Sequence, residues 1–285
     1  MKRIAITGAA GLVGTGLRTQ LLERGYGVHS LDVRPVAIEH PSETSAIADV
    51  TDQAALTREL EGCDTVVHLA ACTTDAAWPE QVKLSMEGSI SLFDAARSAG
   101  VKRVVYASSH HVVGLHPRAP HGPRMGNMAI LRPDSRYAVG KAFGESIGAL
   151  YAYKFGMPVL SIRIGNVNTR PIDRRRLGSW ISFRDLAQLV VIGIEHEDLI
   201  FDVVYGISDA SGRHYDNAAA YALGYVPQDR SEGLDDEVLR DDPPPALGSA
   251  AARAPSELTL GGMFSQAEFV GDSARLLTTH GNDAK

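Results

Sequence analysis

Tyr137 and Lys141 stand four positions apart in the segment YAVGK, a spacing that places two side chains on the same face of a helix. A phenol has an ordinary pKa of about 10. A neighbouring ammonium group favours the phenolate and lowers that pKa, so the pair predicts a general base that works near neutral pH. The same spacing is common on exposed helix surfaces, so its meaning depends on the rest of the chain.

A polar run, Ser108-Ser-His-His111, follows an apolar segment that we predict to be a strand. The Ser109 hydroxyl can hydrogen-bond a substrate hydroxyl and hold it in line with the base. Once Tyr137 has removed the hydroxyl proton, hydride can leave from the same carbon to a nicotinamide ring. The positive charge of the oxidised nicotinamide would lower the pKa of the phenol further. We therefore predict Ser109, Tyr137 and Lys141 as the catalytic residues of a dehydrogenase.

The element that would position a nicotinamide cofactor stands at the start of the chain. A short apolar strand is followed by Gly8, Gly11 and Gly14, and then by a helical apolar period. Glycine is needed where the turn is tight, where the backbone approaches the pyrophosphate, and where helix packs on strand. Asp32 ends the second strand about 20 residues further on, where a carboxylate accepts hydrogen bonds from the adenosine ribose. This pattern predicts that the cofactor is NAD. Arg34 lies close to Asp32, so its positive charge could weaken the preference for NAD over NADP.

Strand-like and helical segments alternate along most of the chain, which predicts an α/β fold with a doubly wound parallel sheet, the Rossmann fold. The predicted strands span 4–6, 26–31, 46–50, 65–69, 103–108, 158–164 and 199–207, and the later helices span 53–60, 80–99, 137–155 and 182–194. Loops are predicted at 115–133 and around 243–245. We interpret residues 1–285 as a single domain in which 166–285 shape most of the substrate pocket.

Ligands of such sheets bind at the carboxyl ends of the strands, where small side chains let the backbone approach the ligand. We therefore expect the cofactor among residues at these ends. The predicted cofactor-binding residues are Gly8, Gly11, Leu12, Val13, Gly14, Asp32, Asp49, Val50, Leu69, Ala70, Ala71, Tyr137, Lys141 and Ile164.

The composition favours a globular enzyme with a small-molecule partner. The net charge of −6 gives no reason to expect nucleic acid or an anionic membrane surface. No apolar run reaches the length of about 20 residues that a membrane span needs, and no signal peptide is predicted. Two cysteines, Cys63 and Cys72, are too few for a disulfide framework, so we expect buried thiols and a cytoplasmic protein. The histidine-rich run at 110–121 lacks the accompanying ligands of a metal site, and we predict no metal.

Three segments together resemble the extended short-chain dehydrogenases/reductases: Thr7-Gly-Ala-Ala-Gly-Leu-Val-Gly14, Ala107-Ser-Ser109 and Tyr137-X-X-X-Lys141. Within that superfamily the chain is most similar to the uronate dehydrogenases. That similarity lies in the segments 107–114, 163–165, 175–180 and 261–264.

The resemblance implies a doubly wound fold and NAD-dependent oxidation of a hexuronic acid, of the galacturonate or glucuronate type. The anomeric C1 hydroxyl would be oxidised, giving an aldarolactone. The implied substrate-binding residues are Thr73, Ser109, His110, His111, Asn166 and Arg175. A guanidinium also suits a carboxylate chemically, because it binds both oxygens at once. The alternative for the arginines at 170 and 174–176 is a solvated basic face, and the choice of Arg175 rests on the resemblance.

The chain departs from the family pattern at four positions. His110 stands where Asn is usual, and Thr73 and Asn166 each stand where Ser is usual. Ser85 replaces a helical Asn that orders the active site. These differences affect the expected substrate more than the expected reaction. The resemblance also implies a homo-oligomer. The small residues Gly140, Gly144 and Gly148 would permit close helix packing, against either another subunit or the protein's own sheet.

Two other functions stay open at this level. A nucleotide-sugar epimerase or dehydratase of the same superfamily would use the same Tyr and Lys, but would return the hydride and release no reduced cofactor. Such enzymes usually carry a larger C-terminal domain than the residues after 207 suggest. A non-catalytic dinucleotide-binding sensor would not need Ser109, Tyr137 or Lys141.

Overall fold

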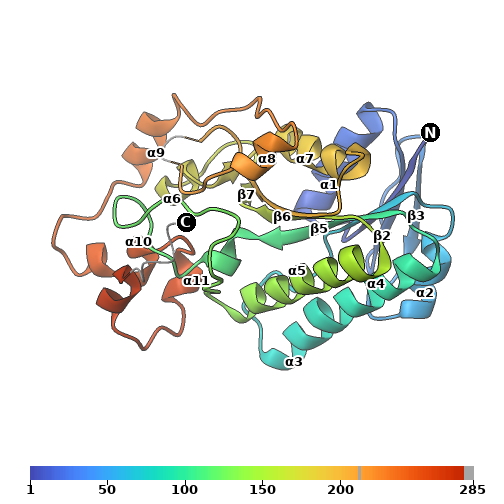
Figure 1. The fold of residues 1–285 in the computed structure, drawn as a ribbon. Coiled ribbons are helices and arrows are strands. Elements are labelled where there is room, and N and C mark those ends of the chain that lie inside the picture. Colours follow the sequence, from blue (N-terminus) through green and yellow to red (C-terminus); the bar gives the residue numbers. More distant parts are fainter. Residues whose placement is uncertain (211–212, 279–285) are drawn as a thin grey trace.

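The computed structural model describes residues 1–210 and 213–278. Its centre is a seven-stranded, wholly parallel sheet (Figure 1) with the strand order β3-β2-β1-β4-β5-β6-β9. The strands are β1 (Arg3–Thr7), β2 (Gly27–Asp32), β3 (Glu43–Ile47), β4 (Thr65–His68), β5 (Arg103–Ser109), β6 (Val159–Ile164) and β9 (Phe201–Gly206), and a separate short pair is formed by β7 (Asn166–Val167) and β8 (Trp180–Ile181). The predicted doubly wound Rossmann fold is confirmed.

Helices cover both faces of the sheet because alternate strand residues point to opposite sides. On one face Ile6 packs with Leu17 of α1 (Leu12–Glu23) and Leu189 of α7 (Phe183–Glu195). On the other face Tyr106 packs with Phe93 and Tyr151, where the sheet is covered by α2 (Gln53–Leu60), α4 (Gly88–Ser98) and α5 (Arg136–Phe155). Figure 1 shows α1 and α7 on one side of the strands and α4 and α5 on the other. Residues from both faces thus form two apolar layers that hold the sheet rigid.

The seven main strands are those predicted, with one shift. The third strand spans Glu43–Ile47 and not 46–50, because β3 is an edge strand whose residues are mostly exposed and polar. The predicted helix at 80–99 is α3 (Trp78–Gln81), a π-helical turn η1 (Val82–Glu87) and α4. The β7–β8 pair was not predicted, because a strand of two residues is too short to show an alternating apolar pattern in the sequence.

The three glycines of α5 pack inside their own chain. A Cβ atom at Gly144 would lie 2.0 Å from the Tyr106 hydroxyl, and one at Gly140 would lie 2.7 Å from Cβ of Ser85. At Gly148 the nearest atom is Cγ1 of Val159. The alternative of packing within the chain is therefore confirmed for these residues, and their spacing gives no argument for a second subunit.

The C-terminal half of the chain adds short elements at one end of the sheet, seen in yellow, orange and red in Figure 1. They are α6 (Arg174–Leu177), α8 (Ala218–Ala222), α9 (Asp235–Asp241), α10 (Pro255–Leu258), α11 (Met263–Gln266) and the 3-10 turns η3 (Ala251–Arg253) and η4 (Ser273–Leu277). A small apolar cluster that includes Val113, Tyr215 and Leu260 joins them to η2 (His110–Val113), the 3-10 turn after β5. Among the described helices none is long and apolar enough to cross a membrane.

Candidate active site

A cavity of about 370 Å³ opens at the carboxyl ends of β4, β5 and β6. It brings together the three predicted catalytic residues and most of the predicted substrate-binding residues. Its lining is Leu12, Val13, Leu69, Thr73, Ala107, Ser108, Ser109, His110, His111, Tyr137, Lys141, Ile164, Gly165, Asn166, Val167, Asn168, Arg170, Ile172, Arg176, Trp180 and Phe264.

Ser109 is held by the way β5 ends. Its backbone is still extended, and its hydroxyl oxygen accepts a hydrogen bond of 3.2 Å from the backbone N–H of His111, which caps η2. Because the oxygen is occupied as an acceptor, the hydroxyl proton is available for donation. Ser109 also shares a side-chain hydrogen bond with Tyr137. Ser109 can therefore donate to the phenol oxygen or to a substrate oxygen beside it.

Tyr137 lies in the first turn of α5 and faces the same cavity. Phe264 stacks on its ring with centroids 6.1 Å apart, and the His111 ring meets it edge-on at 6.0 Å. Burial raises the pKa of Tyr137 to about 12, while the hydrogen bond with Ser109 lowers it and the charge of Asp134 raises it. The expected lowering by Lys141 is absent in this structure, where desolvation of the phenolate is the largest influence on the pKa of Tyr137. The phenol is therefore protonated before the cofactor's positive charge is added.

Lys141 follows one helical turn later and is almost fully buried. Its Nζ donates a hydrogen bond of 2.6 Å to the carbonyl of Ala107 and lies 5.8 Å from the centroid of the Tyr137 ring. Burial lowers the pKa of Lys141 to about 8. The ammonium is thus anchored to the end of β5, beside the phenol, and is poised to lose its proton at mildly basic pH.

We expect Lys141→Met to stabilise the folded protein while it removes activity. Since the pKa of Lys141 is about 8 in the folded protein and 10.5 in the unfolded chain, the folded state binds fewer protons, and keeping this lysine costs stability at neutral pH. That cost is fully present below about pH 8 and disappears as the pH rises toward 10.5. Allowing for the lost bond to Ala107, the free energy of unfolding at pH 7 should rise by roughly 2 kcal/mol. Thermal unfolding at pH 7 and pH 10 checks this, and a variant that is less stable at pH 7 would contradict it.

A buried ion pair lies under the catalytic residues. Glu145, one turn after Lys141, accepts from Nε of Arg163 at 2.9 Å and from Nη2 at 3.0 Å. The same carboxylate accepts from the Ser108 hydroxyl at 2.5 Å. A bidentate pair of this kind fixes geometry as well as charge. It ties α5 to the ends of β5 and β6, so Tyr137 and Ser109 keep one relative position.

A second cavity of about 310 Å³ adjoins the first along Leu69 and Thr73 and runs over the ends of β1 and β2. Its lining includes the predicted cofactor-binding residues Gly8, Gly11, Asp32, Asp49, Val50, Leu69, Ala70 and Ala71. The first cavity contains Leu12, Val13, Tyr137, Lys141 and Ile164 of the same predicted set. The two cavities together form an elongated cleft that suits a dinucleotide.

The glycines explain why the backbone fits such a ligand. At Gly8 (φ 71°), a Cβ atom would lie 2.8 Å from the backbone nitrogen of Ala70. At Gly14 a Cβ would lie 2.5 Å from the carbonyl oxygen of Gly8, so this glycine serves helix packing and lines neither cavity. The first turn of α1 has no side-chain cap at Gly11, so its N–H groups are available for a pyrophosphate.

Asp32 ends β2 at the rim of the second cavity. One carboxylate oxygen accepts from the backbone N–H of Ala10 at 3.0 Å, and the other accepts from the N–H of Arg34, also at 3.0 Å. The Arg34 side chain is mostly exposed and approaches Asp32 to 3.5 Å. The buried carboxylate is therefore fixed in place for the ribose hydroxyls of NAD.

The arginines of α6 are not placed as the sequence suggested. Arg176 lines the first cavity, and so does Arg170, whereas Arg175 does not. Arg176 forms an ion pair with Asp173 and donates to Asn166. Arg175 donates only weakly, at 3.4 Å, to the carbonyl of Leu260, and within 1–210 and 213–278 it has no acidic partner. Its guanidinium remains available for an anion, and a role in substrate binding stays a prediction.

Several lining residues escaped the sequence reasoning. Asn168 and Trp180 come from the segment around the β7–β8 pair, and Phe264 comes from α11. Trp180 and Phe264 lie within the segments 175–180 and 261–264 on which the family resemblance rested, and that was their only signal. The histidines of the run have other partners, such as Tyr215 for His110 at 2.8 Å. In the described part of the chain no three His, Cys, Asp or Glu side chains gather to hold a metal ion.

Fold and cleft are those of a dinucleotide-dependent oxidoreductase, and the predicted catalytic residues Ser109, Tyr137 and Lys141 line one cavity of that cleft. The model of the NAD dependent epimerase/dehydratase family matches residues 4–182, and the chain belongs to that family. Within it, the chain is similar to a uronate dehydrogenase of Pseudomonas putida, with 35% identity over 93% of this chain and 96% of the relative. The protein is an NAD-dependent oxidoreductase, and the predicted cofactor is confirmed.

Two crystal structures have the same architecture. A glucuronic acid dehydrogenase from Chromohalobacter salexigens matches with a TM-score of 0.86 and 31% identity, over 96% of this chain and 98% of that one. A tyrosine-to-alanine mutant of a uronate dehydrogenase from Agrobacterium tumefaciens, complexed with NAD, matches with a TM-score of 0.85 and 30% identity, over 93% and 97%. The predicted resemblance to the uronate dehydrogenases is confirmed.

Proposed function

We propose that the protein oxidises a hexuronic acid, of the galacturonate or glucuronate type, at the anomeric C1 hydroxyl and releases an aldarolactone. The observation that carries this proposal is the shared cavity. Ser109 and Tyr137 line the same cavity as Arg170 and Arg176, and Arg175 directly precedes Arg176 in α6. A substrate hydroxyl would meet the Ser109 and Tyr137 hydroxyls, and a substrate carboxylate would meet a guanidinium group.

The reaction needs one proton and one hydride to leave the substrate. The cleft lined by Gly8, Gly11 and Asp32 would hold NAD, which would supply the acceptor for the hydride from C1. Ser109 donates a hydrogen bond to the C1 oxygen, and the Tyr137 phenolate takes the hydroxyl proton as the C1–O bond becomes a carbonyl. Lys141, anchored to Ala107 at 2.6 Å, stabilises the phenolate by its charge. The chain's own residues thus supply orientation and the proton acceptor.

The predicted substrate residues are proposed to share the sugar among them. Thr73, His110, His111 and Asn166 line the cavity with polar atoms. Asn166 is itself held by Arg176 at 2.9 Å and by Ser179 at 2.9 Å, so its side chain has a fixed direction. We propose Arg175 as the partner of the substrate carboxylate, because it forms no ion pair among the described residues and the charge of Asp173 acts on it only from a distance. Residues 166–285 would then shape most of the substrate pocket of a single domain.

A substrate panel tests the proposal. The purified protein is incubated with NAD and with galacturonate, glucuronate, the neutral parent aldoses and glucose 6-phosphate, and NADH absorbance is followed. We expect rapid NADH formation with at least one uronate and little with the neutral sugars. Activity restricted to neutral sugars or to the sugar phosphate would overturn the proposed substrate. NAD binding with no NADH from any sugar would favour a nucleotide-sugar epimerase or a sensor.

We also propose a homo-oligomer formed through the outer face of α4 and α5. Leu150 and Tyr153 on α5 are 47% and 70% exposed, and Ile90 on α4 is 44% exposed. The three side chains are exposed on two helices that pack against each other, and exposed apolar surface of this kind is typical of protein–protein contacts. Light scattering of the purified protein tests this. A monomer, or an oligomer that Tyr153→Glu leaves intact, would contradict it.

We propose the cytoplasm as the compartment. Both cysteines, Cys63 and Cys72, are free and buried, which suits a reducing environment. A supply of NAD is also needed by the proposed reaction. Fractionation of the source cells, with detection of the protein by antibody, tests this assignment. Recovery in an extracellular or membrane fraction would overturn it.

A further inference from the structure

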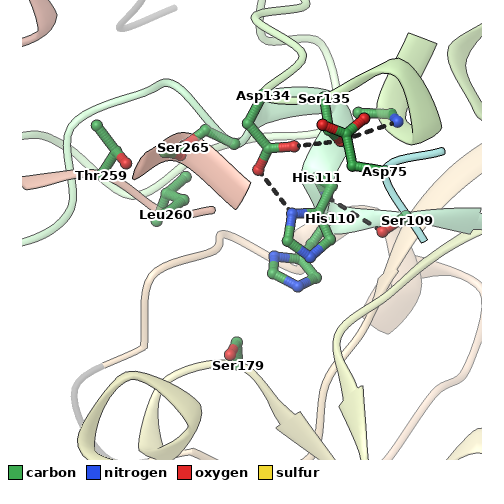
Figure 2. Close-up of polar contacts among 12 residues, drawn as sticks. Asp75, Ser109, His110, His111, Asp134, Ser135, Ser179, Thr259, Leu260 and Ser265 are labelled. Carbon is green, nitrogen blue, oxygen red and sulfur yellow. Dashed lines mark hydrogen bonds and ion pairs between the residues drawn. The ribbon is translucent and has the colours of Figure 1, made fainter. Parts of the chain in front are cut away.

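A buried carboxylate, that of Asp134, lies directly behind the wall of the active-site cavity. Its side chain is fully buried, and Oδ2 lies 2.6 Å from Nδ1 of His111. Its other oxygen accepts from the Ser135 hydroxyl at 2.8 Å. Figure 2 shows Asp134 bridging these two residues, with Ser109 on the far side of the His111 backbone. Asp134 and His111 therefore form a dyad of which only the imidazole reaches the cavity.

The backbone of two distant segments closes on this carboxylate. A Cβ atom at Gly114 would lie 1.9 Å from Oδ2 of Asp134, and one at Gly261 would lie 1.8 Å from it. Ser265, buried beside them, donates to the carbonyl of Gly114. Burying a carboxylate costs free energy unless hydrogen bonds compensate for the lost water. The protein thus buries the Asp134 carboxylate, at a cost in free energy, where it contacts His111 of the active site.

The dyad determines which ring nitrogen carries the proton. An ionised carboxylate only accepts hydrogen bonds, so Nδ1 of His111 must be the donor. In the neutral ring Nε2 is then an acceptor. The His111 ring lines the cavity and meets the Tyr137 ring edge-on at 6.0 Å. Phe264 packs against its other side at 4.7 Å. The ring is held on both flanks and cannot turn without breaking the bond to Asp134.

We propose that Asp134 is a positioning residue that fixes His111 in the Nδ1–H tautomer, so that Nε2 accepts a hydrogen bond from a hydroxyl next to the carbon being oxidised. This proposal deepens the proposed function and rests on it, because it requires a polyhydroxylated substrate. Ser109 donates to the reacting oxygen and Nε2 accepts from its neighbour. Ser109 as donor and His111 as acceptor would thus bind two adjacent oxygens of the sugar. This pair of hydrogen bonds orients the sugar ring and selects the configuration of the second hydroxyl.

The same carboxylate also contacts the start of the catalytic helix. The Ser135 hydroxyl, which donates to Asp134, accepts from the backbone N–H of Ala138 at 3.2 Å and caps α5. Tyr137 lies within that first turn. The buried Asp134 carboxylate therefore holds the His111 imidazole and also contacts Ser135, the residue that caps the helix carrying Tyr137.

A double-mutant cycle distinguishes positioning through His111 from a general structural role. We expect Asp134→Asn to lower kcat/KM for the uronate about 100-fold, because a misplaced or wrongly protonated group costs about this much, while NAD affinity is unchanged. In a His111→Ala background the same substitution should have almost no further effect. An equal loss in both backgrounds, or a loss below twofold in the wild type, would overturn the proposal.

Asp75→Asn is the matched control. Asp75 accepts from the backbone N–H of Arg136 at 2.8 Å, at the same helix start, and has no bond to His111. It should therefore lower kcat/KM far less than Asp134→Asn, and its effect should be equal with and without His111. If Asp75→Asn reproduces the loss caused by Asp134→Asn, the effect belongs to the helix start and the proposal fails.

A second measurement needs no turnover. Nitrogen-15 NMR of the histidine rings reports which nitrogen of His111 is protonated. We expect the Nδ1–H form in the wild-type protein and a shift toward Nε2–H in Asp134→Asn. An Nε2–H ring in the wild type would overturn this inference even if uronates are oxidised. An intact Nδ1–H dyad without uronate oxidation would instead show that the proposed function alone has failed.

Discussion

Tyr137→Phe is expected to lower kcat by about 100- to 10,000-fold, the usual contribution of a positioned general base. The substitution removes only the phenol oxygen, which bonds Ser109 and would accept the substrate proton. Phenylalanine keeps the packing with Phe264 and His111, so the fold and the cofactor cleft should be unaffected. NADH formation measured under saturating NAD and uronate checks the result.

NAD binding by the variant is the control for that experiment. Gly8, Gly11 and Asp32 line the second cavity, which Tyr137 does not line, so the NAD dissociation constant from calorimetry should change less than about threefold. A sensor protein would show the same binding in both forms and no turnover in either. Retention of more than a tenth of the wild-type kcat in Tyr137→Phe would exclude Tyr137 as the base.

Arg175→Met is expected to lower kcat/KM for uronates about 100-fold and to leave activity toward the neutral parent sugars unchanged. A charge-assisted, bidentate hydrogen bond is worth about 1.5–3 kcal/mol, which corresponds to about 10- to 100-fold in affinity. We expect the upper end of this range of affinity, because Arg175 is partly buried and forms no ion pair among the described residues. The ratio of the two specificity constants measures the carboxylate contribution directly.

Arg176→Met is the matched control in the same helix. Arg176 lines the cavity, but Asp173 already neutralises its charge and Asn166 accepts from its Nε at 2.9 Å. Its loss should therefore disturb Asn166 and affect uronates and neutral sugars alike, by about tenfold or less. A selective loss for uronates in Arg176→Met, together with a silent Arg175→Met, would assign the carboxylate to Arg176.

The sequence was most informative where chemistry is local. The glycine turn, Asp32 and the Tyr137–Lys141 pair each depend on a few consecutive residues, and their places in the fold are those predicted. The sheet followed from the alternation of strands and helices, and only its exposed edge strand was misplaced. Edge residues such as Thr44 are exposed and polar, so they lack the apolar signal of a buried strand.

The rest of the site depends on contacts between distant segments. A four-residue helix does not reveal which of Arg175 and Arg176 faces inward, since neighbouring residues lie about 100° apart. Asp134 follows a proline in a region without period, and nothing in that region indicates a buried carboxylate. The predicted direction of the Tyr137 pKa shift was wrong because burial cannot be read from residue spacing. In this structure burial is the largest cause of the shift, and it raises the pKa.

Phe264 has a consequence for the order in which the enzyme becomes active during synthesis. The last sheet strand is complete at Gly206, and the glycine turn and Asp32 leave the ribosome long before. Domains generally fold as they emerge, from the N-terminal side. The nascent chain can therefore acquire its dinucleotide cleft early, whereas the ring that stacks on Tyr137 arrives only with α11. In that order of synthesis, cofactor binding would come before catalytic competence, and a bound dinucleotide would stabilise a chain that does not yet turn over substrate.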